Sequence, residues 1–349
     1  MASSYVIYEN PITHEKFEIK APLTCLVDPV RLRDQLGIPD YVNPQESFQI
    51  RKALVVLWAS RNGKNNEFVN SPFPLSVALF GGGGFKLHCP SANRTGPFSR
   101  KIGDLDFITL KSDGESLVKV LCGLESLSGN MFFHSLTSGD RMFNNLRGQS
   151  RFRLHGIKDI GENGEPISGV VDILCDYLKF CHKLDIREEI HRSDSNFFTI
   201  GLENLIISKT QYIRKVKKDE LPNSERSRIL GDYDKKHFIV GMERKDMIDV
   251  AAALLDHELG DDADEISISR LESKLKQDWK LAKTVCMNLR NMYDRFGSIT
   301  MSSGIKEDQT NAIRNRLTQI LDGLGQDYRT RKGFLVKQWW EDVEDQIPQ

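Results

Sequence analysis

Residues 77–84 read Val77-Ala78-Leu79-Phe80-Gly81-Gly82-Gly83-Gly84, a short apolar stretch that runs directly into four glycines. The apolar run predicts a buried strand over residues 75–80, and we expect a helix to begin at Phe85. Glycine lets the backbone approach a ligand closely, and the first turn of a helix offers free N–H donors to an anion. The segment therefore predicts a phosphate-binding turn, although four glycines alone are also typical of a flexible turn.

A pair of aspartates follows on the next predicted strand, residues 101–110. Asp104 and Asp106 share one face of that strand, while Leu105 and Phe107 share the other. A further aspartate, Asp172, lies inside the apolar run of residues 169–174, where burying a carboxylate without a partner is costly. The pattern places three carboxylates on strands that can lie side by side.

Three such carboxylates suit a site for a divalent cation. Mg²⁺ prefers oxygen ligands, and moving a nucleotide onto a hydroxyl requires metal to neutralise the charge that develops on the phosphates. We therefore predict Asp104, Asp106 and Asp172 as metal ligands and catalytic residues, with Asp172 helping to activate the acceptor hydroxyl. The alternative is that the aspartate pair is solvated and that Asp172 is a capped structural acid.

The hydrophobic pattern predicts an α+β protein with two domains. Residues 1–200 predict an irregular N-terminal arm followed by a sheet with helices, including a hairpin formed by residues 151–157 and 167–174. Residues 201–349 have helical spacing throughout, so we expect an α-only second domain. Its predicted helices cover residues 202–216, 248–255, 269–296 and 308–321. The third of these begins with a capping-box pattern.

Bulk composition narrows the class of protein. The chain has 349 residues, and its 48 Lys and Arg nearly cancel its 49 Asp and Glu, so no global field attracts nucleic acid or a membrane. No apolar run is long enough to span a bilayer. Six cysteines without CxxC spacing argue against a zinc site or a disulfide scaffold. We expect a cytoplasmic protein with reduced thiols and no membrane partner.

The second half contributes two candidate basic groups and a basic cluster. Lys209 and Arg244 each lie on the predicted apolar row of a helix, which predicts either a polar cleft or a snorkelling or ion-paired side chain. Residues 209–245 contain eleven Lys or Arg against six Asp or Glu. Residues 214–218 within them could hold an RNA backbone, although charge runs are usually solvated helix faces.

Four ordered segments of the chain resemble the AbiEii/AbiGii-type nucleotidyltransferase-like toxins, within the DNA polymerase beta-like nucleotidyltransferase superfamily. Residues 77–88 are similar to that family's strand, glycine pair and helix, and residues 100–107 to its RxTxDxDF block, with Ile102 in place of the threonine. Residues 203–209 resemble its EELLxxK segment and residues 243–250 its RxKDxxDL segment. The resemblance covers about residues 75–258.

The resemblance implies a nucleotidyltransferase-fold mixed sheet with flanking helices, followed by an α-helical C-terminal domain. It implies Mg²⁺ or Mn²⁺ as cofactor, a nucleoside triphosphate (NTP) as substrate, tRNA or other RNA as a possible acceptor, and an antitoxin as a possible partner in a toxin-antitoxin or phage-defence system. An inactive nucleotide-binding or protein-interaction protein with the same fold is the alternative. The expected catalytic residues are Asp104, Asp106, Asp172 and Lys209, and the expected nucleotide-binding residues are Gly81, Gly82, Gly83, Lys86, Arg100, Arg244 and Asp246.

Overall fold

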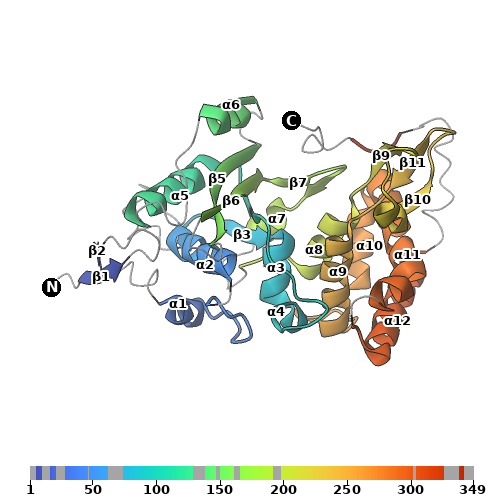
Figure 1. The fold of residues 1–349 in the computed structure, drawn as a ribbon, viewed down its shortest axis with the longest axis horizontal. Helices are drawn as coiled ribbons and strands as arrows, with labels where there is room; N and C mark the ends of the chain where they lie inside the picture. The colour runs from blue at the N-terminus through green and yellow to red at the C-terminus, as the bar shows by residue number, and fades with distance from the viewer. Residues whose placement is uncertain are drawn as a thin grey trace. The chain divides into compact units, whose positions relative to one another are not determined.

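The computed structural model of this chain forms two compact units (Figure 1). It describes residues 5–9, 16–20, 28–45, 47–61, 74–128, 138–146, 150–160, 166–191, 198–301, 304–325 and 338–341. Unit 1 comprises residues 1–87, 101–177 and 185–200, and unit 2 comprises residues 88–100, 178–184 and 201–349. The chain passes into unit 2 for the last time at residue 201, where the sequence predicts a second domain, but two earlier segments also belong to unit 2.

Unit 1 combines a mixed sheet with helices, and the chain as a whole is α+β. Its elements are β1 (Tyr5–Glu9), β2 (Lys16–Lys20), α1 (Pro29–Gln35), α2 (Phe48–Arg61), β3 (Val77–Phe80), α3 (Gly81–His88), β4 (Leu105–Thr109), α5 (Gly114–Ser128), α6 (Ser138–Leu146), β5 (Arg151–Ile160), β6 (Pro166–Cys175) and α7 (Arg187–His191). A short hairpin, β7 (Tyr177–Lys179) and β8 (Lys183–Asp185), carries residues 178–184 of unit 2.

The expected irregular arm contains regular structure. Within this arm, Tyr5–Glu9 and Lys16–Lys20 pair as the antiparallel strands β1 and β2. Helix α1 was not expected. It begins where Asp28 accepts a hydrogen bond from the backbone N–H of Arg31, and Pro29 occupies the first helical position, where no N–H is needed.

The main sheet of unit 1 has the strand order β3–β4–β6–β5. Strand β4 is antiparallel to β3 and parallel to β6, and β6 is antiparallel to β5. The predicted strands around residues 77–80, 105–109, 151–157 and 167–174 are all present, and the hairpin β5–β6 is confirmed. Its predicted connection, residues 161–165, lies outside the described residues.

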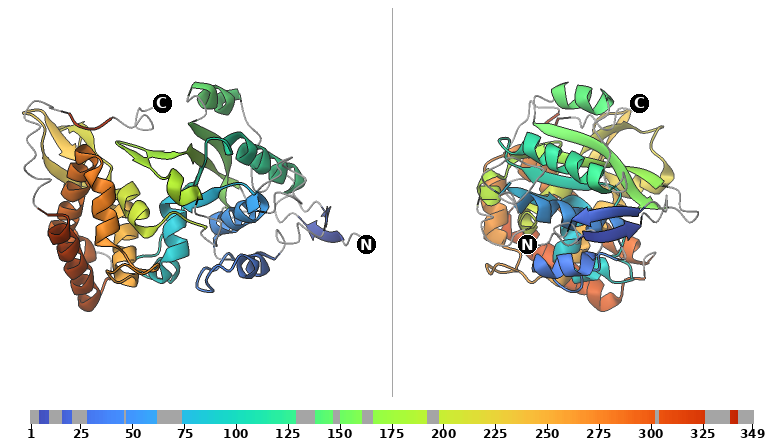
Figure 2. Two further views of the ribbon diagram at one scale, coloured as in Figure 1. Left: turned by 180° about the vertical axis from the view of Figure 1, so that it is seen from behind. Right: turned by 90° about the vertical axis from the view of Figure 1, so that its left-hand side faces the viewer.

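One face of this sheet packs into the core of unit 1. Leu79, Phe107, Ile173 and Phe152 come from its four strands, and all four are buried in one cluster. Helices α2 and α5 contribute leucines and valines to the same cluster, so both helices cover this face (Figure 1, Figure 2). Because side chains alternate along a strand, the residues between these positions point to the opposite face.

Unit 2 is built mainly from helices but also contains strands, so the prediction of an α-only back half was wrong. Its helices are α4 (Pro90–Asn93), α8 (Leu202–Thr210), α9 (Arg244–Asp256), α10 (Ile268–Lys276), α11 (Trp279–Met301) and α12 (Glu307–Gly323). Strands β9 (Arg214–Lys217), β10 (Ile229–Asp232) and β11 (His237–Val240) form an antiparallel sheet in the order β10–β11–β9, with a 3-10 helix, η3 (Asn223–Arg228), before β10.

Two predicted helices of unit 2 are interrupted. The expected helix over residues 202–216 ends at Thr210, and Ile213 and Val216 belong to the segment that enters β9. The expected helix over residues 269–296 is two helices. Ser267, rather than Ser269, caps α10, and the Asp278 carboxylate accepts from the backbone N–H of Lys280 at the start of α11. A capping aspartate in mid-pattern therefore divides an apolar periodicity that reads as continuous.

Candidate functional site

Two predicted aspartates of unit 1, Asp106 and Asp172, form an acidic row across the sheet face opposite the core, with Asp104 at its edge. Asp106 on β4 lies directly opposite Asp172 on β6, and residues that face each other in register project to the same side. Asp172 is 7% exposed and Asp106 is half-buried, whereas Asp104, at a bend just before β4, is exposed. The structure thus brings Asp106 and Asp172 together and places Asp104 at the edge of the same strand.

Gly81 adjoins the acidic row. Its φ of 62° lies in the left-handed region, which favours glycine. A Cβ built at this position would lie 2.2 Å from Oδ2 of Asp106, so the carboxylate fills the space that any other residue's side chain would need. The junction of β3 and α3 therefore requires glycine for two independent reasons. One is the positive φ, and the other is the nearby carboxylate of Asp106, a predicted metal ligand.

The glycine run itself differs from the expected open turn. Helix α3 begins at Gly81 rather than at Phe85, so Gly81, Gly82 and Gly83 form its first turn, and all are buried. A Cβ on Gly83 would lie 2.9 Å from a methyl carbon of Leu79, which gives this glycine a packing role. Lys86 follows on the same helix and is half-buried. Phosphate binding by these residues stays a prediction.

Two arginines on β5 occupy the carboxylate of Asp172. Arg153 lies opposite Asp172 in register and donates from Nε to Oδ1 at 3.0 Å and from Nη2 to Oδ2 at 3.0 Å. Arg151 donates from Nη2 to Oδ2 at 2.9 Å. All three side chains are at least three-quarters buried. The arginines supply the counter-charge that a buried carboxylate needs, in the place where the sequence predicts a cation.

The carboxylate oxygens of the three aspartates are ligands that suit a hard cation. The three side chains are not arranged around one point where such a cation could bind. Among the residues that the structure describes, no group of three His, Cys, Asp or Glu side chains is placed to hold a metal ion. Asp104 and Asp106 offer the carboxylate oxygens that Mg²⁺ or Mn²⁺ prefers. Asp172 would have to exchange at least one arginine contact to join them.

Three of the predicted residues of unit 2, Lys209, Arg100 and Asp246, meet in a separate ion-pair cluster. Lys209 on α8 donates to Oδ1 of Asp246 on α9 at 3.0 Å, and its Nζ lies 3.3 Å from Oδ2 of Asp249. Arg100 binds both oxygens of Asp249, with 2.7 Å between Nε and Oδ1. Asp246 also closes the capping box of α9 by accepting from the backbone N–H of Glu243. The cluster joins α8, α9 and residue 100 of unit 2.

The charges in this cluster stabilise one another. Burial alone lowers the pKa of Lys209, but the carboxylates of Asp246 and Asp249 outweigh it and hold that pKa above its ordinary value. Burial likewise raises the pKa of Asp246, and the ammonium of Lys209 more than offsets this effect and lowers it. The pair is therefore charged at neutral pH, as a buried ion pair must be to repay its desolvation.

Arg244 lies apart from this cluster. It is exposed at the first position of α9, although the sequence places it on the buried row of that helix. It lines a cavity of about 300 Å³ in unit 2 together with Arg228, Glu225 and Glu243. Asp249 on the same helix is bound by Arg100 and Lys209 rather than by Arg244.

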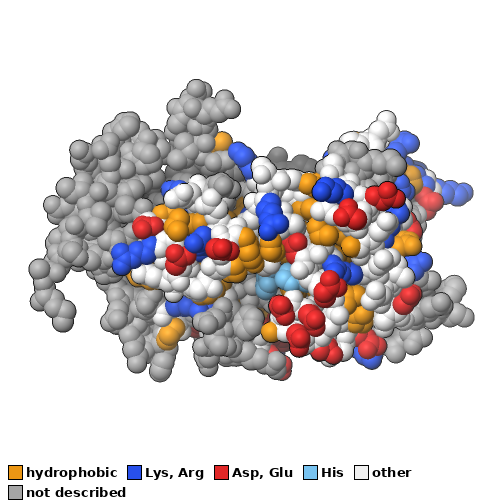
Figure 3. Space-filling model, turned by 90° about the horizontal axis from the view of Figure 1, so that it is seen from below, with side chains coloured by type: hydrophobic (Ala, Val, Ile, Leu, Met, Phe, Trp, Pro, Cys, Tyr) orange, Lys and Arg blue, Asp and Glu red, His pale blue; other side chains and the backbone are white. Residues whose placement is uncertain are grey.

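The basic cluster of residues 214–218 is largely neutralised by acids. Arg214 pairs with Glu225, Lys217 with Glu220 and Lys218 with Asp232. Lys215 lies over the ring of Tyr233, 5.1 Å from its centroid. On the face drawn in Figure 3, acidic side chains gather in one patch, and the basic side chains lie in small separate groups. These contacts leave less positive charge for an RNA backbone than the count of residues suggests.

Sequence reasoning missed Arg151 and Arg153. The two arginines alternate on a strand whose hairpin partner carries Asp172, so their period of two was the available signal. Asp249 lies three residues after Asp246, on a neighbouring turn of one helix, and both reach Lys209.

Searches for similar proteins among family models, curated sequences and solved structures found no match.

Proposed function

We propose that this protein is a metal-dependent nucleotidyltransferase that moves a nucleotide from an NTP to a hydroxyl group of another molecule. The observation that carries the proposal is the placement of Asp106 opposite Asp172 on neighbouring parallel strands, with Asp104 just before them and Gly81 against Asp106. A strand, a glycine turn and two strand-borne acids in this order also support the proposed nucleotidyltransferase fold.

Each acid has a proposed role. Asp104 and Asp106 would hold Mg²⁺ or Mn²⁺, which supplies electrostatic stabilisation to the phosphates when bound. Asp172 would accept a hydrogen bond from the acceptor hydroxyl and orient it. The guanidinium groups of Arg151 and Arg153 each donate hydrogen bonds to the carboxylate of Asp172 and hold it in place.

The arginines give the site a second capability. A guanidinium group presents a planar fork of donors that matches phosphate oxygens as well as it matches a carboxylate. Arg151 and Arg153 would therefore bind the triphosphate when Asp172 turns to the acceptor. Lys86, on the helix that follows the glycines, and Gly81, Gly82 and Gly83 are further proposed contacts of the triphosphate.

The residues of unit 2 have supporting roles in this proposal. Lys209 would neutralise the distal phosphates, and Arg100, Arg244 and Asp246 would contribute to nucleotide binding. In the structure Lys209 is committed to Asp246 and Asp249, so it contributes as a phosphate ligand only if it leaves one of them. The proposal therefore depends less on these four residues than on the three aspartates.

The biological setting follows from the sequence resemblance alone. We propose a cytoplasmic toxin of the AbiEii/AbiGii type, with RNA such as tRNA as the acceptor and an antitoxin as a neutralising partner. Of the helices that the structure describes, none combines the length and the apolar character needed to cross a membrane.

A radiolabel transfer assay tests the activity. The protein is incubated with each α-³²P-labelled NTP, Mg²⁺ and total cellular RNA or protein, beside the Asp104→Asn, Asp106→Asn double variant. We expect label in one macromolecular fraction with one NTP, and a loss of at least about a hundredfold in the double variant, because carboxylate ligands of a metal site cannot be replaced by neutral amides without loss of charge. Equal labelling by both proteins would reject the assignment.

The arginine contacts of Asp172 also favour a second candidate, a protein that binds an NTP without transferring it. Both oxygens of Asp172 are occupied, which is how an acid that has lost its catalytic task would be held. This candidate predicts NTP binding in equilibrium dialysis with no release of pyrophosphate. Pyrophosphate release that depends on an acceptor supports the transferase instead.

A further inference from the structure

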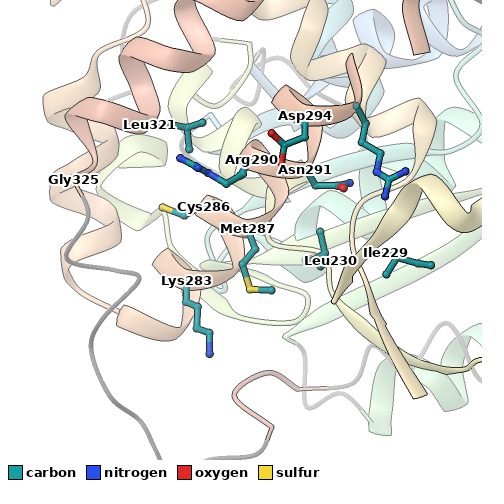
Figure 4. Close-up of a pocket in the computed structure, with 11 residues that line it drawn as sticks. Ile229, Leu230, Lys283, Cys286, Met287, Arg290, Asn291, Asp294, Leu321 and Gly325 are labelled. Atoms are coloured by element: carbon teal, nitrogen blue, oxygen red, sulfur yellow. The ribbon is translucent and has the colours of Figure 1, made fainter. Parts of the chain in front are cut away.

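Unit 2 contains a cavity of about 800 Å³ that the proposed activity does not use (Figure 4). Among the residues that the structure describes, those that line it come from β10, α11, α12 and the segment just after α12, within residues 229–325. The volume falls within the range of about 300–1,000 Å³ that is typical of small-molecule sites. The space is large enough to hold a ligand about the size of a nucleotide or a two-ring compound.

Part of the wall is apolar. Leu230 on β10, Met287 on α11 and Leu321 on α12 line the cavity from three elements, and each is only half-buried. Figure 4 shows these side chains on separate elements around the cavity. Partly exposed apolar side chains that converge on one hollow provide a surface that gains free energy when an apolar group covers it.

The wall also carries positive charge. Among the described residues that line the cavity, Lys283, Arg290 and Arg295 are basic, and Asp294 supplies the carboxylate. The Nζ atom of Lys283 lies 3.4 Å from the centroid of the Trp339 ring, which fixes this ammonium group at one side. Arg290 is exposed and makes no ion pair with the residues that the structure describes. A positive charge without a carboxylate partner is available to an anion.

We propose that this cavity is a binding site for a small organic anion that carries a phosphate, sulfonate or carboxylate group on an apolar ring system. The anionic group would bind Arg290 and its cationic neighbours, and the rings would cover Met287, Leu230 and Leu321. The site lies within unit 2 and shares no residue with the acidic row of unit 1, so the proposal holds whether or not the chain transfers nucleotides.

The first test uses the fluorescent probe 8-anilinonaphthalene-1-sulfonate, which has a sulfonate on an apolar ring system. We expect saturable binding with one site per chain. The uncharged analogue N-phenyl-1-naphthylamine should bind at least about tenfold more weakly, because it lacks the group that Arg290 recognises. Equal affinity for both probes would mean that the cavity, or another apolar surface, does not select an anion.

A charge-reversal pair locates the binding. Arg290→Glu should raise the dissociation constant of the sulfonate probe at least about tenfold, since it replaces attraction with repulsion. Lys280→Glu makes the same change at an exposed position of the same helix outside the cavity wall, and it should change the constant less than about twofold. Arg290 is exposed, so the variant should fold, which far-ultraviolet circular dichroism checks.

A footprint of Cys286 provides an independent location. This thiol lines the cavity and is half-buried, and Cys122 in unit 1 is half-buried as well. The probe should slow alkylation of Cys286 by iodoacetamide at least about fivefold and leave Cys122 unchanged, as measured by mass spectrometry of the peptides. If saturating probe leaves the rate of Cys286 alkylation unchanged, the proposal is wrong.

Discussion

At the scale of single residues, Gly81 shows how closely the acidic row is fitted to its surroundings. Its backbone has a positive φ, and Oδ2 of Asp106 occupies the position of a Cβ. Both features are local, yet they link the glycine run to the predicted metal ligand through direct contact.

Gly81→Ala should therefore destabilise the protein by about 2–4 kcal/mol, through backbone strain and displacement of Asp106. Two controls separate these causes in thermal unfolding. Gly37→Ala shares the positive φ but has nothing within 4 Å of the new Cβ, so it should cost about 1 kcal/mol. Gly103→Ala has neither feature and should be close to neutral. A Gly81→Ala variant as stable as Gly103→Ala would contradict the contact with Asp106.

His182 gives the protein a residue-level pH dependence. It is buried in unit 2 and its Nε2 lies 2.8 Å from Oγ1 of Thr284. Burial lowers the pKa of His182 to about 4, from an ordinary value of 6.5. The folded protein thus binds this proton less readily than the unfolded chain does, so the contribution is complete above pH 6.5 and is lost as the pH falls towards 4.

The free energy of unfolding of unit 2 should therefore fall by about 3 kcal/mol from this residue between pH 6.5 and pH 4. Urea titrations across that range measure it. His182→Gln should flatten the pH dependence, and His155→Gln, at an exposed position of unit 1, should not. An unchanged slope in His182→Gln would show that other groups produce the acid sensitivity.

At the scale of elements, the ion-pair cluster joins α8 to α9. Asp249→Asn removes the carboxylate that both Arg100 and Lys209 contact and leaves two partly buried cations short of a partner. Breaking such a pair typically costs about 3–5 kcal/mol. Glu272→Gln removes an acid from an exposed i,i+4 pair with Lys276 and should cost less than about 0.5 kcal/mol. Chemical denaturation compares the two, and equal losses would mean that the cluster is not a stabilising one.

The sequence predicts elements well where their pattern is local. The alternation of Asp104 to Phe107 and the hairpin of residues 151–174 indicate strands, and the strands are present. It fails where a polar contact overrides a periodic pattern, as Asp278 does when it caps a new helix inside an apolar repeat. It also fails where the helix stops inside the pattern, as α8 does at Thr210, before Ile213. A hydrophobic period shows which face is buried, but it does not show where the backbone changes direction.

The candidate site is predictable to a similar degree. Asp106 and Asp172 lie side by side because the sheet pairs their strands in register, as their flanking apolar residues indicate. The counter-charges on Asp172 were not predicted. The alternation of Arg151 and Arg153 was an available signal, but the residue that they face depends on the register of β5 against β6, and a shift of one residue would turn Arg153 to the other face. The apolar spacing that predicts α9 defines a buried row that begins only after the first turn of the helix. Extending this row back to Arg244 placed that residue on a buried face.

At the scale of the whole molecule, the charge is nearly balanced, and the chain is divided into two units whose segments interleave in sequence. Binding of the proposed NTP would therefore depend on local groups, such as the arginines of β5, rather than on a global field. The proposed acidic row and the cavity of unit 2 belong to different units, so variants at one should leave the other's binding intact.

The most direct test of the central claim is direct titration of the protein with Mn²⁺, followed by electron paramagnetic resonance, in the presence of an NTP. We expect one or two bound ions per chain, and we expect Asp104→Asn, Asp106→Asn to weaken their binding at least about tenfold together with loss of nucleotide transfer. Mn²⁺ binding that is the same in this variant and in the unmodified protein would contradict the claim that these carboxylates form a metal site.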